Sequence, residues 1–397
     1  MAAPTFPARS KDLLRRWVWL VPSLAVFFAS AFTRGGDHVD AGVFGYAYHA
    51  LTSARGLHLY ADHPEVQVGP LGILLAHIGS FDHARLSVPS VAVSVLLFLL
   101  VLLGLRRAVG DRSEVEPGLW VMSITGSCVG YAWSGLVPAT AHVEDALAIA
   151  LMVWAFVFSR RERMDVAGVL IALAVAAKPW GIFAAGLVLV PKGRLRGLAG
   201  IIAVSAVCWL PFLVTEPHSL TELSKYRIDT GAGSLWSLWG LDYAPHYERP
   251  LQLAVAVAGA IALWRVGMMD CVLLWIFGSR LFLDAGTFGY YLPGLVVGAA
   301  LIDMAAMRSD MRARIPIVAP AALAFTSLGP VPLADQTSWS RVAVIAAVVG
   351  IGCFVCWHAS SPDGVTERPR VPGVRRIGRV REIAPFGLNP AGAEVDS

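Results

Sequence analysis

The sequence has little charge for its length. Asp, Glu, Lys and Arg make up only 15% of its 397 residues, whereas an average soluble domain carries about 25%. Hydrophobic residues make up 56%, and the mean hydropathy is +0.63. The polar surface of a water-soluble protein is missing, and apolar runs near the roughly 20 residues that cross a bilayer recur instead. The composition therefore predicts an integral membrane protein.

Cysteine is also scarce, and neither sign of charge dominates. The five cysteines lie inside apolar runs without histidine partners, so neither a disulfide framework nor a zinc site is indicated. Cys353 and Cys356 stand three residues apart, which indicates packing on one helical face. The net charge of +4 comes from Lys and Arg in short loops between apolar runs, as membrane topology requires. Nucleic acid is therefore not an expected partner.

Two further features are missing. The apolar run 17–32 follows Arg15 and Arg16 but has no small-residue cleavage site, so we interpret it as an uncleaved first helix. No internal repeat is visible, which disfavours a transporter built from inverted repeats.

What the chain does contain is a series of apolar segments separated by basic loops. Because basic loops stay in the cytoplasm, both termini are expected there, which requires an even number of crossings. We predict an all-α polytopic protein of the plasma membrane with about 12 transmembrane or half-membrane helices over 17–357. Residues 1–16 form a cytoplasmic N-terminus, and 358–397 a disordered basic cytoplasmic tail. The apolar segments are 17–32, 86–105, 118–137, 143–158, 165–177, 179–191, 197–214, 251–266, 269–283, 287–306, 315–330 and 341–357.

One pair of basic loops predicts a broken helix. Residues 160–163 and 192–196 are both basic and therefore both cytoplasmic, yet about 28 residues separate them. Two half-helices that meet at Lys178-Pro179 resolve the conflict, because proline interrupts helical hydrogen bonding and disfavours helix at the preceding residue.

The outer side then holds two long loops, 33–85 and 215–250. In the first, Asp40 to Ser53 has the pattern of an amphipathic helix with Val43 and Ala47 on its apolar face. Residues 70–79 are apolar but too short to span, and we expect them in the membrane interface.

Ionisable residues at the outer ends of spans mark the candidate site. Asp37 and Asp40 follow the first span three residues apart, so either is a candidate general base. Asp40 as a helix N-cap is the structural alternative. Farther along the loop, His63, Glu65 and Gln67 indicate a polyol-binding rim, with an ordinary polar loop as the alternative.

A second group stands at helix ends. His142, Glu144 and Asp145 open an apolar run. Coordination of a hard cation is one interpretation, and helix capping explains one of the acids. Lys178 and Arg280 are the cations best placed for an anionic ligand such as a lipid phosphate, with pairing to the acids as the alternative. Tyr290 and Tyr291 suit either a sugar site or the interfacial aromatic belt.

The order of these motifs resembles that of a known family. Asp40-Ala-Gly-Val-Phe44, Gly56-Leu-His-Leu-Tyr60 and Gly69-Pro-Leu resemble the first outer loop of the actinobacterial GT-C glycosyltransferases of family 87. His142-Val-Glu-Asp145, Ala177-Lys178-Pro179-Trp180 and Arg280-Leu-Phe-Leu-Asp284 follow in the family's order. The resemblance extends over residues 15–310.

The resemblance implies a GT-C-like fold and an inverting mannosyltransferase that uses no metal or other cofactor. The donor would be a polyprenyl-monophosphate sugar, and the acceptor a hydroxyl of a cell-envelope glycolipid or polysaccharide on the extracytoplasmic side. Asp40 would be the base, with Asp37 in reserve. The implied donor-phosphate ligands are His142, Lys178 and Arg280, and the implied sugar or acceptor contacts are His63, Glu65, Gln67, Glu144, Asp145, Tyr290 and Tyr291.

Two departures leave the sugar open. This chain has Val68-Gly69-Pro70 where many relatives have a Tyr-Pro-Pro-like element, and Phe44 where they have tyrosine. Transfer of arabinofuranose therefore stays an alternative to mannose. A lipid or sugar transporter is an alternative of another class, and it predicts charges on both sides of the midplane rather than at outer ends. A non-catalytic membrane scaffold would leave the outer Asp, His, Lys and Arg without a purpose.

Overall fold

The computed structural model describes most of the chain up to residue 360. The described residues are 17–34, 41–81, 87–110, 118–219, 221–222, 226–231, 234–286, 291–306, 315–328 and 338–360. They belong to one compact unit, Met1–Ser360. Of the expected cytoplasmic segments 1–16 and 358–397, residues 1–16 and 361–397 lie outside the described residues. Residues 358–360, expected to be disordered, are instead the end of a helix, Ser338–Ser360. Within the described ranges the protein is helical, and its only extended pairing is an isolated bridge between Asp229 and Tyr243.

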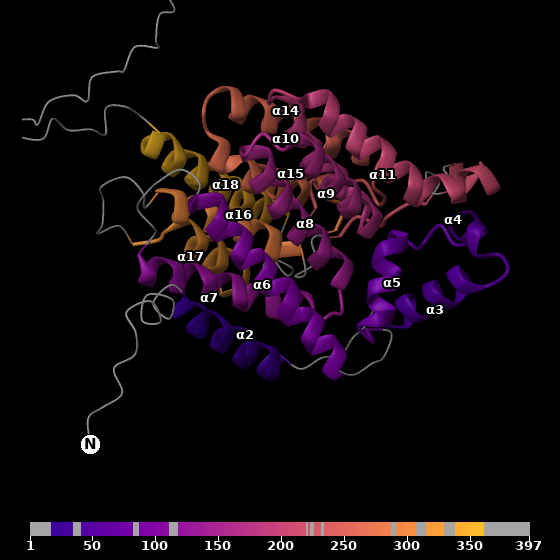
Figure 1. The fold of residues 1–397 in the computed structure, drawn as a ribbon, viewed down its shortest axis with the longest axis horizontal. Coiled ribbons are helices and arrows are strands. Elements are labelled where there is room, and N and C mark those ends of the chain that lie inside the picture. The colour runs from indigo at the N-terminus through magenta and orange to yellow at the C-terminus, as the bar shows by residue number, and fades with distance from the viewer. Residues whose placement is uncertain are drawn as a thin grey trace, which may run out of the picture. The chain divides into compact units, whose positions relative to one another are not determined.

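A helix or helical turn forms in each of the apolar segments identified from the sequence, as Figure 1 shows in chain order. The elements of these segments are α2 (Leu20–Arg34), α6 (Val88–Gly110), α7 (Leu119–Leu136), α8 (Val143–Arg160), α9 (Met164–Ala177), η2 (Pro179–Ala185) with α10 (Gly186–Leu189), α11 (Arg194–Thr215), α14 (Glu248–Arg265), η3 (Met269–Cys271) with α15 (Val272–Leu283), α16 (Leu292–Ala306), α17 (Val318–Leu323) with the π-helical η5 (Ala324–Leu328), and α18 (Ser338–Ser360). The all-α prediction is confirmed for the described residues.

Three of these helices are long and apolar enough to cross a membrane: Val88–Gly110, Arg194–Thr215 and Ser340–His358. Four further helical segments are apolar but shorter. The outer face of α11 also exposes large apolar side chains, a surface suited to lipid rather than water: Leu195, Ile202, Val207, Leu210 and Val214. These features support a helical membrane protein. Twelve crossings and a GT-C-like arrangement stay predictions.

The helix break at Lys178-Pro179 is confirmed. Helix α9 ends at Ala177, Lys178 adopts an extended conformation (φ −147°, ψ 124°), and η2 begins at Pro179. Pro179 has no N–H to offer, and its ring disfavours helix at Lys178. The break turns the lysine side chain out of the helical repeat and toward the start of α8.

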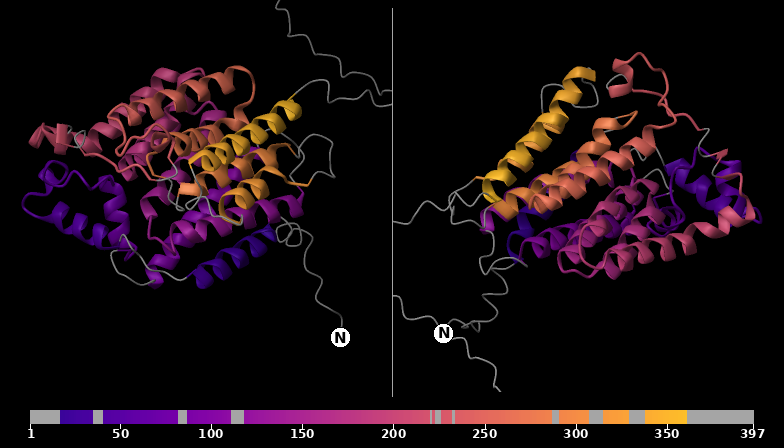
Figure 2. Two further views of the ribbon diagram at one scale, coloured as in Figure 1. Left: turned by 180° about the vertical axis from the view of Figure 1, so that it is seen from behind. Right: turned by 90° about the horizontal axis from the view of Figure 1, so that it is seen from above.

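The first loop is largely helical, in α3 (Ala41–Thr52), η1 (Gly56–His58), α4 (Leu59–Asp62) and α5 (Pro70–Ile78). Figures 1 and 2 show α3, α4 and α5 as a group beside one end of α11. The predicted helix after Asp40 is present, and Ala47 is buried as expected. Val43, however, is exposed, because it faces a cavity rather than the packed side of α3.

Helix α5 contacts the body of the protein through glycines. The N–H of Gly69 donates to the carbonyl of Ala177 at 3.0 Å. A Cβ on Gly72 would lie 2.5 Å from the Ala177 carbonyl oxygen and 2.7 Å from Glu144 Cβ. Only glycine permits this approach. The Gly69-Pro-Leu-Gly72 stretch thus positions the first loop against the end of α9 and the start of α8.

Helix α8 lies at the centre of the packing. It contacts α6, α9, α5 and α10, and most of its residues are buried. On the other side α15 and α16 pack together and against α18. This arrangement brings the first residues of α8, the break after α9 and the last turn of α15 toward one cavity.

Candidate functional site

A cavity of about 1020 Å³ lies among elements that are distant in sequence. Its walls come from α3 and the loop before α5, the start of α8, the break with η2, the segment before α14, and the end of α15. The lining combines aromatic and aliphatic side chains with acids and cations. Its charged and histidine members are Glu65, His142, Glu144, Lys178, His246, Glu248, Arg249, Arg280 and Asp284.

The cavity collects most of the residues predicted from sequence that the structure describes. Seven of them line it: Glu65, Gln67, His142, Glu144, Lys178, Arg280 and Tyr291. Asp145 lies directly behind the wall, in contact with three of its side chains. His63 does not line the cavity. The two candidate bases, Asp37 and Asp40, and Tyr290 lie outside the described residues.

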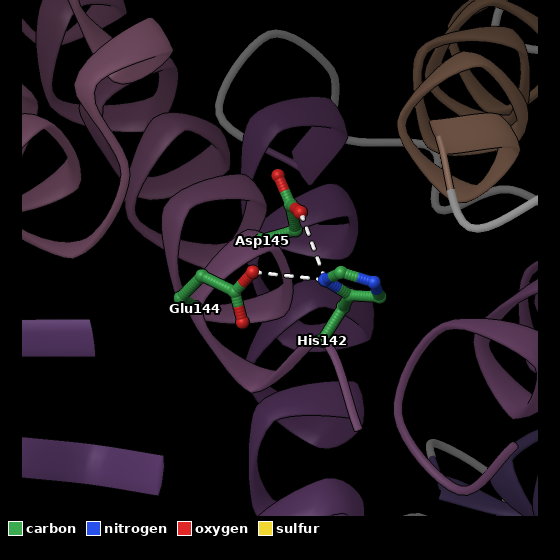
Figure 3. Close-up of side chains that lie close together, drawn as sticks. All are labelled: His142, Glu144 and Asp145. Atoms are coloured by element: carbon green, nitrogen blue, oxygen red, sulfur yellow. Dashed lines mark hydrogen bonds and ion pairs between the residues drawn. The ribbon is translucent and has the colours of Figure 1, made fainter. Parts of the chain in front are cut away.

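His142, Glu144 and Asp145 lie close together at the N-terminus of α8 (Figure 3). His142 Nδ1 lies 2.9 Å from Glu144 Oε1 and 3.7 Å from Asp145 Oδ2. Both carboxylates are buried, with exposed fractions of 0% and 1%. The partial positive charge of a helix N-terminus favours acids in the first turn, but it does not replace the lost hydration of two carboxylates. Further cations are required, and the structure supplies them.

Lys178 is the first of these cations. Its Nζ donates to Glu144 Oε1 at 3.0 Å and lies 3.9 Å from Asp145 Oδ2. The break that places Lys178 here therefore provides the counter-charge for the start of α8. Trp180, two residues later, donates from Nε1 to Asp145 Oδ1 at 2.5 Å. The Ala-Lys-Pro-Trp motif thus contacts both acids.

Arg280 is the second cation and is held between two aromatic rings. Its guanidinium carbon lies 4.1 Å from the ring centroids of both Trp180 and Tyr291, which is a cation–π arrangement. Arg280 Nη1 lies 3.8 Å from Asp145 Oδ1, and Arg280 Nε lies 3.8 Å from Asp284 Oδ2. Asp145 and Asp284 therefore share Arg280.

The start of α14 completes the charged wall, and sequence reasoning did not select it. Arg249 Nη1 lies 3.3 Å from Asp284 Oδ2 and 3.9 Å from Glu248 Oε1, and it donates to Gln252 Oε1 at 2.9 Å. The available signal was the pair Glu248-Arg249 immediately before the apolar run at 251. We name the whole set the charged cluster: His142, Glu144, Asp145, Lys178, Glu248, Arg249, Arg280 and Asp284.

Glu248 is an acid of this cluster with a raised pKa. It precedes the apolar segment of α14, and its exposed fraction is 2%. Burial raises the pKa of the Glu248 carboxyl to about 7; Arg249 opposes this rise, and the nearby Asp284 adds to it. Burial disfavours the charged form of a carboxyl group.

His142, Glu144 and Asp145 are also the residues that meet the geometric requirement for a metal ion. One ligand atom from each lies within 4.8 Å of the others. Glu144 Oε1, however, accepts from the Lys178 ammonium at 3.0 Å. A divalent ion bound there would lie near this ammonium.

The outer rim of the cavity is more exposed. His63 contacts Glu65, with 3.5 Å between Nδ1 and Oε1, and the Tyr46 hydroxyl lies 2.5 Å from His63 Nδ1. Tyr60 is buried below the rim and donates from its hydroxyl to the carbonyl of Val68 at 2.9 Å. His63 thus orients Glu65 rather than reaching the cavity itself.

Comparison with known protein families, with curated proteins and with solved structures finds no match to this chain. The function must therefore be argued from the cavity and from the sequence motifs that line it.

Proposed function

We propose that the protein is a membrane glycosyltransferase that moves a sugar from a polyprenyl-monophosphate donor to a hydroxyl of a cell-envelope glycolipid or polysaccharide. The observation that carries the proposal is the charged cluster, whose three cations (Lys178, Arg249 and Arg280) and three of its acids (Glu144, Glu248 and Asp284) line one cavity of about 1020 Å³. Such a cavity offers groups for a phosphate and groups for proton transfer at a single place.

The size and the apolar part of the cavity suit a lipid-linked donor. Small-molecule pockets measure roughly 300–1000 Å³, so this one accommodates a phosphate, a sugar and part of an acceptor together. One side is formed by Ile182, Phe183, Trp209 and Leu253. These side chains would contact the first isoprene units while the phosphate reaches the cations.

Each group in the wall then has a role in this proposal. Lys178 and Arg249 have part of their side chains exposed, 14% and 40%, and are the cations within reach of a phosphate. Arg280 is enclosed by aromatic rings, so it would act on the phosphate through the field of its charge. His142 borders the same wall. Gln67, Glu65 and Tyr291 would contact the sugar or acceptor.

The base is proposed from the sequence resemblance. Asp40 would take the proton of the acceptor hydroxyl, with Asp37 in reserve, and the sugar would be transferred with inversion. Mannose is the first choice of sugar and arabinofuranose the second. The reaction would take place on the extracytoplasmic side of the plasma membrane, which is where the positive-inside rule puts this end of the helices.

The test is a transfer assay with purified protein in lipid nanodiscs. Polyprenyl-phosphate mannose and polyprenyl-phosphate arabinose are each offered with membrane glycolipid acceptors. We expect transfer by the natural sequence and none by Asp40→Asn, with Asp37→Asn partly active. Full activity of Asp40→Asn together with an inactive Asp37→Asn would reverse the assignment of the base. Absence of transfer from every donor, with uptake of labelled lipid or sugar into vesicles, would identify a transporter instead.

A further inference from the structure

Glu248 and Arg249 are the first two residues of α14, and both line the same cavity as His142 and Glu144. The described hydrogen bonds of the Glu248 side chain both go to Oε1, which accepts from Gln252 Nε2 at 3.0 Å and from the N–H of Ala285 at 2.9 Å. These two donors fix the carboxyl group. Because Oε1 already accepts two hydrogen bonds, Oε2 is the oxygen that would carry the proton of a neutral carboxyl group.

Arg249 is fixed in a similar way. The hydrogen bonds of its guanidinium to Gln252 and Asp284 both start from Nη1. The side chain lines the cavity and is 40% exposed, and the described hydrogen bonds leave Nη2 and Nε available to a ligand. A guanidinium held at one nitrogen presents the others in a fixed geometry that matches a phosphate.

We propose that Glu248 is the general acid of the reaction, which donates its proton to the lipid phosphate as this leaves the sugar, while Arg249 holds that phosphate beside it. The inference rests on the proposed function. It assigns to Glu248 a role that is separate from that of Asp40, because one group protonates the leaving group and the other accepts the proton of the nucleophile.

The proposed step is balanced in atoms and charge. The acceptor oxygen bonds to the anomeric carbon and loses its proton to Asp40. The bond between that carbon and the phosphate oxygen breaks, and its electron pair stays on the oxygen, which takes the proton of Glu248. The donor phosphate carries one negative charge, and the protonated lipid phosphate still carries one. Water then returns a proton to Glu248 and removes one from Asp40.

Burial and the neighbouring Asp284 carboxylate favour a neutral Glu248 before the reaction. Glu248 is the acid whose pKa burial raises to about 7, which is close to the second pKa of about 6 of a phosphate monoester. Matched values favour proton transfer between the two groups.

The groups that face Glu248 agree with this assignment. Arg249 comes from its own helix, and Arg280 and Asp284 come from α15 and the residue after it. The neighbouring η2 contributes no titratable side chain, since it consists of Pro-Trp-Gly-Ile-Phe-Ala-Ala. Asp284 is itself paired with Arg249 and Arg280.

The experiment measures kcat and donor KM of the full chain between pH 5.5 and 9. A general acid works only while protonated, so kcat of the natural sequence should fall as pH rises above about 7. Glu248→Gln keeps an oxygen for Gln252 and Ala285 but has no proton to give. We expect a kcat about 100-fold lower, no decline above pH 7, and a donor KM that changes little. Glu248→Asp should restore the pH-dependent decline.

Two controls separate the possible failures. Glu162→Gln, on an exposed turn after α8, should leave kcat and its pH profile unchanged. Thermal unfolding shows whether each variant is folded. If the natural sequence transfers sugar and Glu248→Gln keeps the decline above pH 7, or loses rate only through a raised KM, the acid role is overturned and the transferase remains. If the natural sequence transfers no sugar from any polyprenyl phosphate, the proposed function itself fails, and the acid role with it.

Discussion

Helix α8 has a buried ion pair at each end, and the two ends differ in a way that separates structure from function. At its last residue, Arg160 Nη1 lies 2.5 Å from Asp270 Oδ1, and the guanidinium carbon is 5.4 Å from the Phe156 ring centroid. Neither residue lines the large cavity. At its first residues, Glu144 and Asp145 share Lys178 and Arg280 within a cluster that lines it.

The two ends differ in whether their charged side chains line a cavity that a ligand could enter. The Arg160–Asp270 pair connects α8 to η3. In the charged cluster, by contrast, Lys178 and Arg249 line the cavity and keep part of their side chains exposed. Pairing of buried charges is weak as an argument for stability. Charged and titratable side chains that line a cavity are the better indicator of a ligand site.

Asp303 provides a third case within the same bundle. Its carboxylate accepts hydrogen bonds from the backbone N–H groups of Ile317, Val318 and Ala319 at 3.0, 3.0 and 2.7 Å. It therefore caps the start of α17 and needs no cation. A buried acid in a membrane segment is a functional candidate by default. The backbone hydrogen bonds to Asp303 indicate a structural role instead.

The largest expected effect comes from removing one cation at each end of α8. Lys178→Met leaves Glu144 without its ammonium partner, and Arg160→Met does the same to Asp270. Breaking a buried pair costs about 3–5 kcal/mol, so both variants should unfold at lower temperature. Only Lys178→Met should also reduce transfer by folded protein, by about 100-fold. Unfolding is followed by tryptophan fluorescence, and transfer is normalised to the folded fraction.

Either of two results would contradict the comparison. A folded Arg160→Met protein without activity would show that the Asp270 end is part of the site. A folded and fully active Lys178→Met protein would reduce the Ala-Lys-Pro-Trp motif to a structural role. Lys178→Arg, which keeps the charge, serves as the matched variant.

Only part of the charged cluster was predictable from the sequence. The break at Lys178 followed from proline chemistry and from the basic loops on either side of it. The start of α8 followed from three ionisable residues in four positions ahead of an apolar run. Both are local patterns. The contacts of Arg280 with Trp180 and Tyr291, and of Glu248 with Ala285, join residues that only tertiary packing brings together, and no local pattern contains them.

The first loop shows the same limit. Its short helices near Ala41–Thr52 and Pro70–Ile78 were predictable from apolar periodicity and from Pro70. The need for glycine at position 72 was not predictable from the sequence, because the atoms that exclude a Cβ there belong to Glu144 and Ala177. Val43 was expected on a packed face and instead lines the cavity, because a cavity accepts the same apolar residues as a core.

A second prediction tests whether the charged cluster depends on the close packing of Gly72 in α5 against Glu144 and Ala177. Gly72→Ala would place a Cβ 2.7 Å from Glu144 Cβ and 2.5 Å from the Ala177 carbonyl oxygen. We expect a loss of about 1–3 kcal/mol and a transfer rate reduced about 10-fold or more, because small displacements of binding groups have large effects on rate.

Gly350→Ala in α18 is the matched control. A Cβ at Gly350 meets nothing within 4 Å, and alanine is favoured over glycine inside a helix by about 0.5–1 kcal/mol. This variant should be slightly more stable and fully active. Equal behaviour of the two alanine variants would mean that the contact of α5 with α8 does not position the charged cluster.

The smallest expected effect is that of removing divalent metal. His142, Glu144 and Asp145 have the geometry for an ion, yet the Lys178 ammonium already lies 3.0 Å from Glu144 Oε1. If internal cations replace a metal at this end of α8, transfer should be unchanged after treatment with a chelator and should not rise with added Mg²⁺ or Mn²⁺. Suppose instead that the chelator abolishes transfer by the natural sequence, that Mn²⁺ restores it, and that His142→Gln shows neither effect. An ion would then displace the Lys178 ammonium, and the acids at the start of α8 would be metal ligands, which would increase the contrast with the Arg160–Asp270 pair.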